Sequence, residues 1–352
     1  MGTELPLCQE LFDHVTSSPG NPFLRLSFAP NQPSIESRYY IDDDKELICF
    51  KKTFLMVFKE AHQYFNRYND KYISDYPIDR STYLASLALL FTTSENKTII
   101  NVHEQCLEAL IYCSMDELRR EIVFIQRLLS CTNNKLNKSS SLWVLYKKIY
   151  DRFHSKVTID VCTTVINSAT NHFSNYYAWN SARWFYINGE TELHNDLLDE
   201  TKTFCLKNFK DSAAWSAFLF MLLPNIAAEH EVIQPKYSSP NKFSLINNQH
   251  QVDSEMVDSV ATDVADLLDS LMIVEWSPFC FILSIVQLHH SKASQAIMLK
   301  WNKQITDFEL NYKEITFVHK QPYVDQDESN FTIRQRILHF GYKKRVLLSM
   351  VI

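Results

Sequence analysis

The pattern of apolar and polar positions predicts a chain of helices separated by short polar turns. Apolar residues recur at intervals of three and four, as in Leu118, Ile122, Ile125 and Leu129, which is the spacing of one face of an α-helix. The same pattern predicts helices over 46–69, 81–92, 102–113, 115–130, 142–153, 158–173, 176–187, 190–207, 211–223, 253–272, 278–290, 293–310 and 331–348.

Two stretches lack this pattern. Residues 1–45 are predicted to be irregular because prolines punctuate a polar stretch, and the acidic triplet at 42–44 favours a helix N-terminus just after it. A polar, proline-containing run predicts a flexible loop over 231–252. The chain therefore divides into an N-terminal segment (1–45), helical-hairpin repeats (46–230), the loop, and C-terminal helical repeats (253–352).

Three tryptophans fall at equal intervals. Trp143, Trp179 and Trp215 are 36 residues apart (179 − 143 and 215 − 179), and each comes just inside an apolar run that follows a polar turn. A fixed period of this length is typical of stacked supersecondary units. We therefore expect an all-α fold, an α-solenoid crescent of antiparallel helical hairpins. Tetratricopeptide repeats, the nearest alternative, recur at about 34 residues with a glycine-containing pattern that this chain lacks.

Composition supports helices and excludes several function classes. The chain of 352 residues has four glycines, where average usage would give roughly two dozen. Tight hairpin turns and phosphate-cradling loops need glycine, so an all-β fold, a Rossmann fingerprint and a P-loop are disfavoured. The serines form no acyl-transfer motif, and the net charge of −6 without a basic cluster argues against nucleic acid.

The cysteines and histidines do not predict a metal site. Eight cysteines are scattered without a C-x-x-C pair, which favours a reducing compartment and hence a cytoplasmic location. The adjacent His289 and His290 would point about 100° apart on a helix and could not readily share a metal. No signal region and no run of about 18 apolar residues appears, so no membrane span is expected.

The best copy of the repeat, residues 160–186, resembles the protein prenyltransferase α-subunit repeat, whose signature is roughly P-K-N-Y-x-x-W-x-x-R-R-W. The matching residues are Asn175, Tyr176, Trp179, Arg183 and Trp184. The resemblance spans about residues 80–290 and is greatest to a divergent branch identified as the α-like subunit of a type III protein geranylgeranyltransferase. It implies half of an enzyme, inactive alone, which transfers geranylgeranyl from its diphosphate to a protein cysteine, with a SNARE-type trafficking protein as a candidate acceptor.

The resemblance implies roles for individual residues. Lys138 lies where the family's second repeat places a catalytic lysine that offsets negative charge on the departing diphosphate. Tyr176 and Tyr177 would bind substrate in the same cleft. Asn175 would cap a helix, and Arg183 would join neighbouring hairpins. The core would contain Trp143, Trp179, Trp184 and Trp215.

The same resemblance implies a partner. A β subunit of the Rab geranylgeranyltransferase type would carry the catalytic zinc, because this chain shows no clustered metal ligands and is expected to bind no cofactor itself. The isoprenoid diphosphate and the acceptor would meet at the shared cleft.

Some residues depart from the family pattern. Ser174 stands where the family often has lysine, and no arginine follows Trp143 or Trp215 at the family's spacing. A non-catalytic α-solenoid scaffold for protein–protein interaction is therefore the alternative hypothesis. The acidic face of the 253–272 helix is expected to be solvated, with a partner-binding surface as the minor alternative.

Overall fold

The computed structural model describes residues 4–17, 25–31, 37–42, 45–67, 76–111, 114–223, 253–311 and 328–350. These residues are mostly helical, so the predicted all-α class is confirmed. They divide into two compact units, one up to Leu193 and one from His194, and each is described by itself. Because the units are not placed relative to one another, a crescent-shaped stacking of the whole chain stays a prediction. The expected loop over 231–252 lies outside the described residues.

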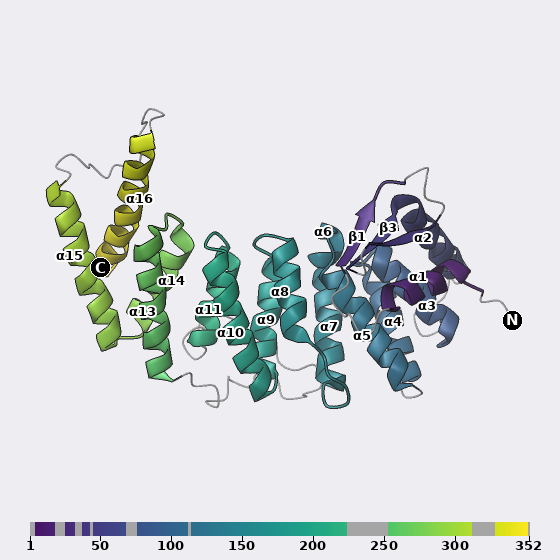
Figure 1. The fold of residues 1–352 in the computed structure, drawn as a ribbon. Coiled ribbons are helices and arrows are strands. Elements are labelled where there is room, and N and C mark those ends of the chain that lie inside the picture. The colour runs from purple at the N-terminus through teal and green to yellow at the C-terminus, as the bar shows by residue number, and fades with distance from the viewer. Residues whose placement is uncertain are drawn as a thin grey trace. The chain divides into compact units, whose positions relative to one another are not determined.

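The first unit begins with a helix and a small sheet, followed by helices that lie side by side (Figure 1). The sheet has the strand order β1-β3-β2, with β1 parallel and β2 antiparallel to β3. The elements are α1 (Pro6–Thr16), β1 (Arg25–Ala29), β2 (Tyr39–Asp42), β3 (Glu46–Phe50), α2 (Lys51–Asn66), α3 (Arg80–Thr92), α4 (Lys97–Ile111), α5 (Met115–Leu129), α6 (Asn134–Asn137), α7 (Ser140–Phe153), α8 (Val161–Asn171) and α9 (Tyr176–Asn188).

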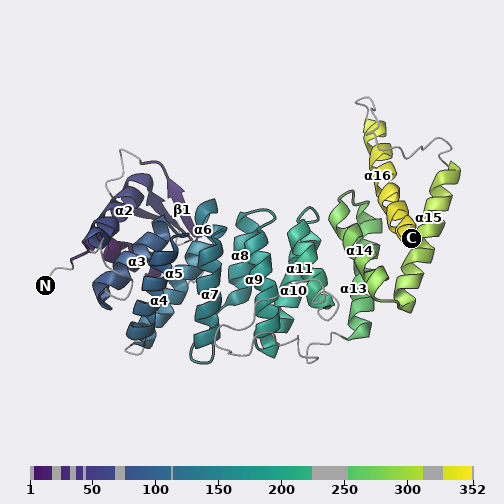
Figure 2. The same ribbon diagram turned by 180° about the vertical axis from the view of Figure 1, so that it is seen from behind.

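The second unit is helical throughout its described part. Helix α11 packs against α14, and α15 packs against both α13 and α16. Figure 2 shows the same elements from behind. The helices are α10 (Thr191–Lys207), of which all but the first three residues belong to this unit, α11 (Ser212–Leu222), α13 (Ser254–Leu271), α14 (Trp276–Leu288), α15 (Lys292–Asn311) and α16 (Glu328–Leu348).

The N-terminal segment is where the predictions from the pattern were wrong. Residues 1–45 are not simply irregular, because α1, β1 and β2 lie there. Pro6 occupies the first turn of α1, where a proline costs no hydrogen bond. The expected helix start near residue 46 is instead β3, in which Leu47 and Cys49 are fully buried. A short apolar run of this kind fits a buried strand as well as a helix.

The first residues of three successive repeat helices are spaced by the same 36 residues as the tryptophans. Helices α7, α9 and α11 begin at residues 140, 176 and 212, and the repeat tryptophan is the fourth residue of each. The backbone nitrogen of each tryptophan donates to the carbonyl of the N-cap residue, at 3.1–3.2 Å. In α14 the fourth residue is Phe279, which is fully buried. The repeat therefore continues there with a phenylalanine, one turn after Trp276.

The repeat tryptophans are core residues, as expected. Trp143, Trp179, Trp184 and Trp215 expose 1–2% of their surface. In the first unit α7 packs against α5 and α9, and the ring of Phe185 lies 5.6 Å from that of Tyr146. A large ring at a helix start fills the space that two neighbouring hairpins leave, which explains why one position in each copy is aromatic.

Candidate functional site

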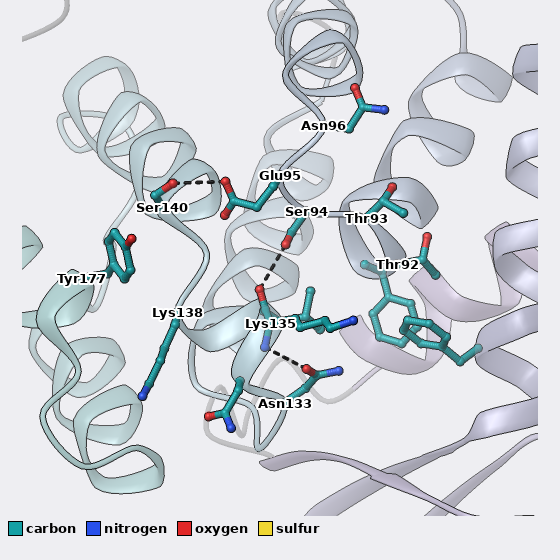
Figure 3. Close-up of a pocket in the computed structure, with 14 residues that line it drawn as sticks. Thr92, Thr93, Ser94, Glu95, Asn96, Asn133, Lys135, Lys138, Ser140 and Tyr177 are labelled. Carbon is teal, nitrogen blue, oxygen red and sulfur yellow. Dashed lines mark hydrogen bonds between the residues drawn. The ribbon is translucent and has the colours of Figure 1, made fainter.

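A cavity of about 550 Å³ opens in the first unit, where the α3–α4 turn, α6 and the start of α9 meet (Figure 3). This volume lies within the range of ligand sites in proteins. In Figure 3, Lys138 and Tyr177 lie on one side and Thr92 and Thr93 on the other, with Lys135 between them. The lining residues are Phe54, Phe91, Thr92, Thr93, Ser94, Glu95, Asn96, Asn133, Asn134, Lys135, Leu136, Lys138, Ser140 and Tyr177.

The apolar part of the lining is aromatic. The rings of Phe54 and Phe91 lie 5.3 Å apart, and Phe28 of β1 packs against both at 5.7 and 5.4 Å. Phe91 is fully buried at the end of α3. The N-terminal sheet therefore supports one wall of the cavity.

The short helix α6 supplies the two cationic groups. The side chain of Asn133 caps this helix by accepting from the backbone nitrogen of Lys135 at 2.9 Å, and Ser94 donates to the carbonyl of Lys135 at 3.2 Å. Lys135 is exposed and Lys138, the C-cap, is half-buried. In the described part of the chain, no carboxylate lies within ion-pair distance of either ammonium group.

Glu95, the one carboxylate of the lining, is held by the first turn of α7. Its oxygens accept hydrogen bonds from the hydroxyls of Ser139 (2.5 Å), Ser141 (2.8 Å) and Ser140 (3.1 Å). Burial alone would raise the pKa of this carboxyl, but the serine hydrogen bonds outweigh burial and lower it. Glu95 therefore stays ionised at the positive end of the α7 dipole.

A buried polar network fixes the turn between α8 and α9 next to the cavity. The Asn175 amide donates to Asn137 Oδ1 and, at 3.0 Å, to Ser168 Oγ, while its oxygen caps α9 by accepting from the Ala178 nitrogen at 3.3 Å. Asn137, Ser168 and Asn175 are completely buried. The capping role predicted for Asn175 is confirmed, and the network also ties α9 to α6.

The aromatic residues of this turn are exposed. Phe173, Tyr176 and Tyr177 expose 62%, 61% and 40% of their surface, and the rings of Tyr176 and Tyr177 meet edge to face at 5.9 Å. Ser174, which lies between Phe173 and Tyr176 in the chain, has a φ of 52°, in the left-handed region that residues other than glycine seldom adopt. Tyr177 lines the cavity, while Tyr176 is not among its lining residues.

The structure thus brings together two of the predicted site residues, Lys138 and Tyr177, and leaves Tyr176 beside them. Burial, and after it the charge of Lys138, lowers the pKa of His172 at the start of the turn. Glu95 and Asn137 were missed by sequence reasoning. The run of serines after Lys138 was the available signal for Glu95, since a helix N-terminus attracts a carboxylate.

The arginine expected after Trp143 has a lysine counterpart. Lys147 follows Trp143 by four residues, as Arg183 follows Trp179, and both are buried, with 5% and 6% exposed. The Lys147 ammonium lies 5.8 Å from the centre of the Trp184 ring, and burial lowers its pKa to about 8.

A second polar cluster in the first unit has the Ser–His–Glu arrangement of a catalytic triad, but it is not accessible to a substrate. Ser86 Oγ lies 2.9 Å from His103 Nδ1, and His103 Nε2 lies 3.0 Å from Glu121 Oε1. Tyr83 donates to the other oxygen of Glu121 at 2.6 Å. Ser86, His103 and Glu121 expose none of their surface, so no substrate reaches them. The cluster joins α3, α4 and α5.

The acidic face of the 253–272 helix, now α13, is largely solvated, as expected, because Asp253, Glu255, Asp263 and Asp266 are exposed. Its carboxylates pair with neighbouring elements of the second unit: Asp258 with His289 at 3.1 Å, Asp263 with Lys202 at 3.1 Å, and Asp266 with Lys300 at 2.7 Å. Asp269 pairs with both Lys300 and Lys343. The charge run therefore also holds helices of the second unit together, and its use as a partner surface stays the minor alternative.

Two further searches concern chemistry and membranes. Within the described ranges, no group of three or more His, Cys, Asp or Glu side chains is placed to hold a metal ion. Cys113 lies outside these ranges, and the other cysteines are free thiols. Of the helices that the structure describes, none has the length and apolar character that crossing a bilayer requires.

Comparison with known proteins gives one consistent result. Family models of the N-terminal, middle and C-terminal domains of ECM9 match residues 1–130, 142–249 and 257–351. Protein ECM9 of Saccharomyces cerevisiae (strain ATCC 204508 / S288c) is 34% identical over 369 aligned positions, which cover 99% of this chain and 96% of that protein.

These matches correct the assignment made from the sequence. No prenyltransferase α-subunit family is detected, so the family assignment was wrong, and the geranylgeranyl-transfer function and the β-subunit partner fall with it. The roles toward a diphosphate given to Lys138, Tyr176 and Tyr177 lose their premise, as does the zinc expected on that partner. The physical reason is that an aromatic residue at a repeated helix start reports hairpin packing, which unrelated helical families share.

Proposed function

The chain belongs to the ECM9 family, and from the geometry of its first unit we propose that the protein binds an acidic, extended segment of another polypeptide in the cavity beside α6. One observation carries the proposal: Lys135 and Lys138 have no carboxylate partner in the described structure, while the carboxylate beside them, Glu95, is held by three serines. This is a locally positive site on a chain whose net charge is −6.

The polar lining suits a peptide backbone. Asn96, Asn133 and Asn134 carry amides, and Thr92 and Thr93 carry hydroxyls. These groups donate and accept hydrogen bonds, as the alternating N–H and C=O groups of an extended chain require. The lining residues include no histidine or cysteine, and their one carboxylate, Glu95, is a weak base because the serine hydrogen bonds lower its pKa. Binding accounts for this lining better than catalysis does.

The lysines supply the preference for acidic segments. Exposed ion pairs contribute about 0.2–1 kcal/mol each, and together two of them correspond to roughly a tenfold change in affinity. They also raise the association rate of an oppositely charged ligand, and this effect falls with added salt. The cytoplasmic location expected from the cysteines stays a prediction.

Fluorescence anisotropy with labelled octapeptides tests the proposal. A peptide of alternating Glu and Gly should bind the full-length protein, and the same peptide with Lys in place of Glu should not. The double variant Lys135→Ala/Lys138→Ala should weaken binding about tenfold. Lys59→Ala/Lys207→Ala removes the same charge from two exposed lysines that do not line the cavity and should change binding little. Equal losses in the two double variants would overturn the proposal.

A further inference from the structure

We infer that the exposed aromatic turn formed by Phe173, Tyr176 and Tyr177 is the apolar half of this binding site, and that it selects acidic segments carrying a large apolar residue beside the acidic stretch. The inference rests on the proposed function and adds the second determinant of its ligand. Tyr177 connects the two halves, because it lines the cavity and also contacts the ring of Tyr176.

The repeat itself does not require tyrosines at these positions. With the 36-residue register, Tyr176 and Tyr177 correspond to Ser140 and Ser141 in the preceding copy and to Ser212 and Ala213 in the following one. Each pair occupies the first two positions of its helix, so small residues satisfy the fold there. Packing within the unit also does not account for the tyrosines, since they expose 61% and 40% of their surface.

The backbone that carries these rings is held in place by the turn. Asn175 is completely buried between the exposed aromatic residues and is bonded to Asn137 and Ser168. Ser174 takes a left-handed backbone conformation that a serine seldom adopts, which fixes the direction in which the chain enters α9. A tyrosine on a fixed backbone has only two side-chain torsions left to order when a ligand covers it, which favours aromatic anchors at binding surfaces.

Charge decides which partner fits. Lys138 and Tyr177 line the same side of the cavity (Figure 3), so the exposed rings stand beside a cation. An apolar residue of the ligand would cover the rings while its acidic neighbours meet Lys138 and Lys135. The chain's net charge of −6 disfavours the alternative, a membrane surface, because such surfaces are commonly anionic.

The test compares two peptides on matched proteins. The probes are the labelled Glu–Gly octapeptide and the same peptide with one added Trp at its end. The double variant Tyr176→Ser/Tyr177→Ala introduces the residues that the following repeat already has at these positions, so it should fold normally. Wild-type protein should bind the Trp peptide about tenfold more tightly than the plain one. The variant should lose this preference and bind the two peptides with equal affinity.

The outcomes separate the two proposals. Equal binding of both peptides by wild type, or a preference that survives in the variant, would overturn the inference and leave the acidic site intact. Failure of the plain peptide to bind, with no effect of the lysine variants, would overturn the proposed function itself. Sedimentation of wild type but not of the variant with vesicles of phosphatidylcholine and phosphatidylserine would assign the rings to a membrane surface and so overturn the peptide inference.

Discussion

The carboxylate of Glu95 accepts a 2.5 Å hydrogen bond from the hydroxyl of Ser139, so a residue of the α3–α4 turn closes the N-terminus of α7. Ser139 itself caps the helix by accepting from the backbone nitrogen of Leu142 at 3.2 Å. Two successive hairpins are thus joined by a chain of hydrogen bonds at the edge of the cavity, and this arrangement can be tested.

Replacing the carboxylate should loosen that junction in a pH-dependent way. Glu95→Ala is expected to lower the free energy of unfolding by about 1 kcal/mol, the usual loss when a helix cap is removed. Because the serines lower the pKa of Glu95 in the folded protein, the stabilisation is complete above the unfolded value of about 4.3 and is lost as pH falls. Urea unfolding at pH 7 and pH 3.5 measures it. A loss of equal size at both pH values would contradict the assignment.

The Asn175 side chain should matter more as a donor than as a cap. Asn175→Ala is expected to cost about 2–3 kcal/mol, because Asn137 and Ser168 are left buried with fewer partners. Asn175→Asp keeps the capping oxygen, as Asp211 does in the next copy, but cannot donate to Asn137. Both variants should therefore destabilise the protein in urea unfolding. A neutral Asn175→Asp would show that only the cap matters.

The Ser86–His103–Glu121 cluster should behave as structure. Glu121→Gln is expected to lower the free energy of unfolding by about 1–3 kcal/mol, since an amide cannot replace both carboxylate oxygens that face Tyr83 and His103. Ser86→Ala should cost only about 1 kcal/mol. Thermal unfolding of the two variants provides the comparison. Labelling of Ser86 by a fluorophosphonate in the native wild-type protein would contradict the burial argument.

Lys147 should make the protein more stable at alkaline pH. The folded pKa of about 8 lies below the unfolded value of about 10.4, so between these values the unfolded state binds more protons and stability rises with pH. Lys147→Met removes the buried charge and should raise stability at pH 7 by roughly 1–3 kcal/mol. Urea midpoints from pH 7 to pH 10 should rise in wild type relative to the variant. Parallel curves would contradict the prediction.

Asp269 should make α16 sensitive to acid. Burial would raise the pKa of this carboxyl, but its interactions with the neighbouring His339, Lys300 and Lys343 outweigh burial and lower it strongly. Its contribution is therefore complete above the unfolded value of about 3.9 and is lost as pH falls below it. The hydrogen-exchange protection of α16, measured relative to the intrinsic exchange rate at each pH, should fall on acidification in the full chain, and in Asp269→Asn it should be low already at neutral pH. Asp263→Asn, on the exposed side of the same helix, is the matched control.

Helix boundaries were readable from the sequence where capping residues and apolar spacing agree. Ser139, Asn175 and Asp211 each precede a helix, and the predicted starts near 142, 176 and 211 lie within two residues of those observed. The strand β3 was not readable, because Leu47 to Phe50 form a continuous apolar run whose periodicity fits both structures.

The candidate site could be predicted from the sequence only in part. Lys138 and Tyr177 stood out in polar turns, but Glu95 is 43 residues from Lys138 (138 − 95), and nothing local connects them. Their meeting depends on how one hairpin packs on the next. The same holds for α13, where the acidic spacing indicated a charged face and only the tertiary fold supplied Lys202, Lys300 and Lys343.

The segment around α6 has a consequence for comparing relatives. Residues 131–141, which contain both cavity lysines and the serines that hold Glu95, lie between the stretches matched by the N-terminal and middle family models. A relative could match both domains fully and still carry a different linker there. Inheritance of the binding site should therefore be judged from this linker and not from the domain matches alone.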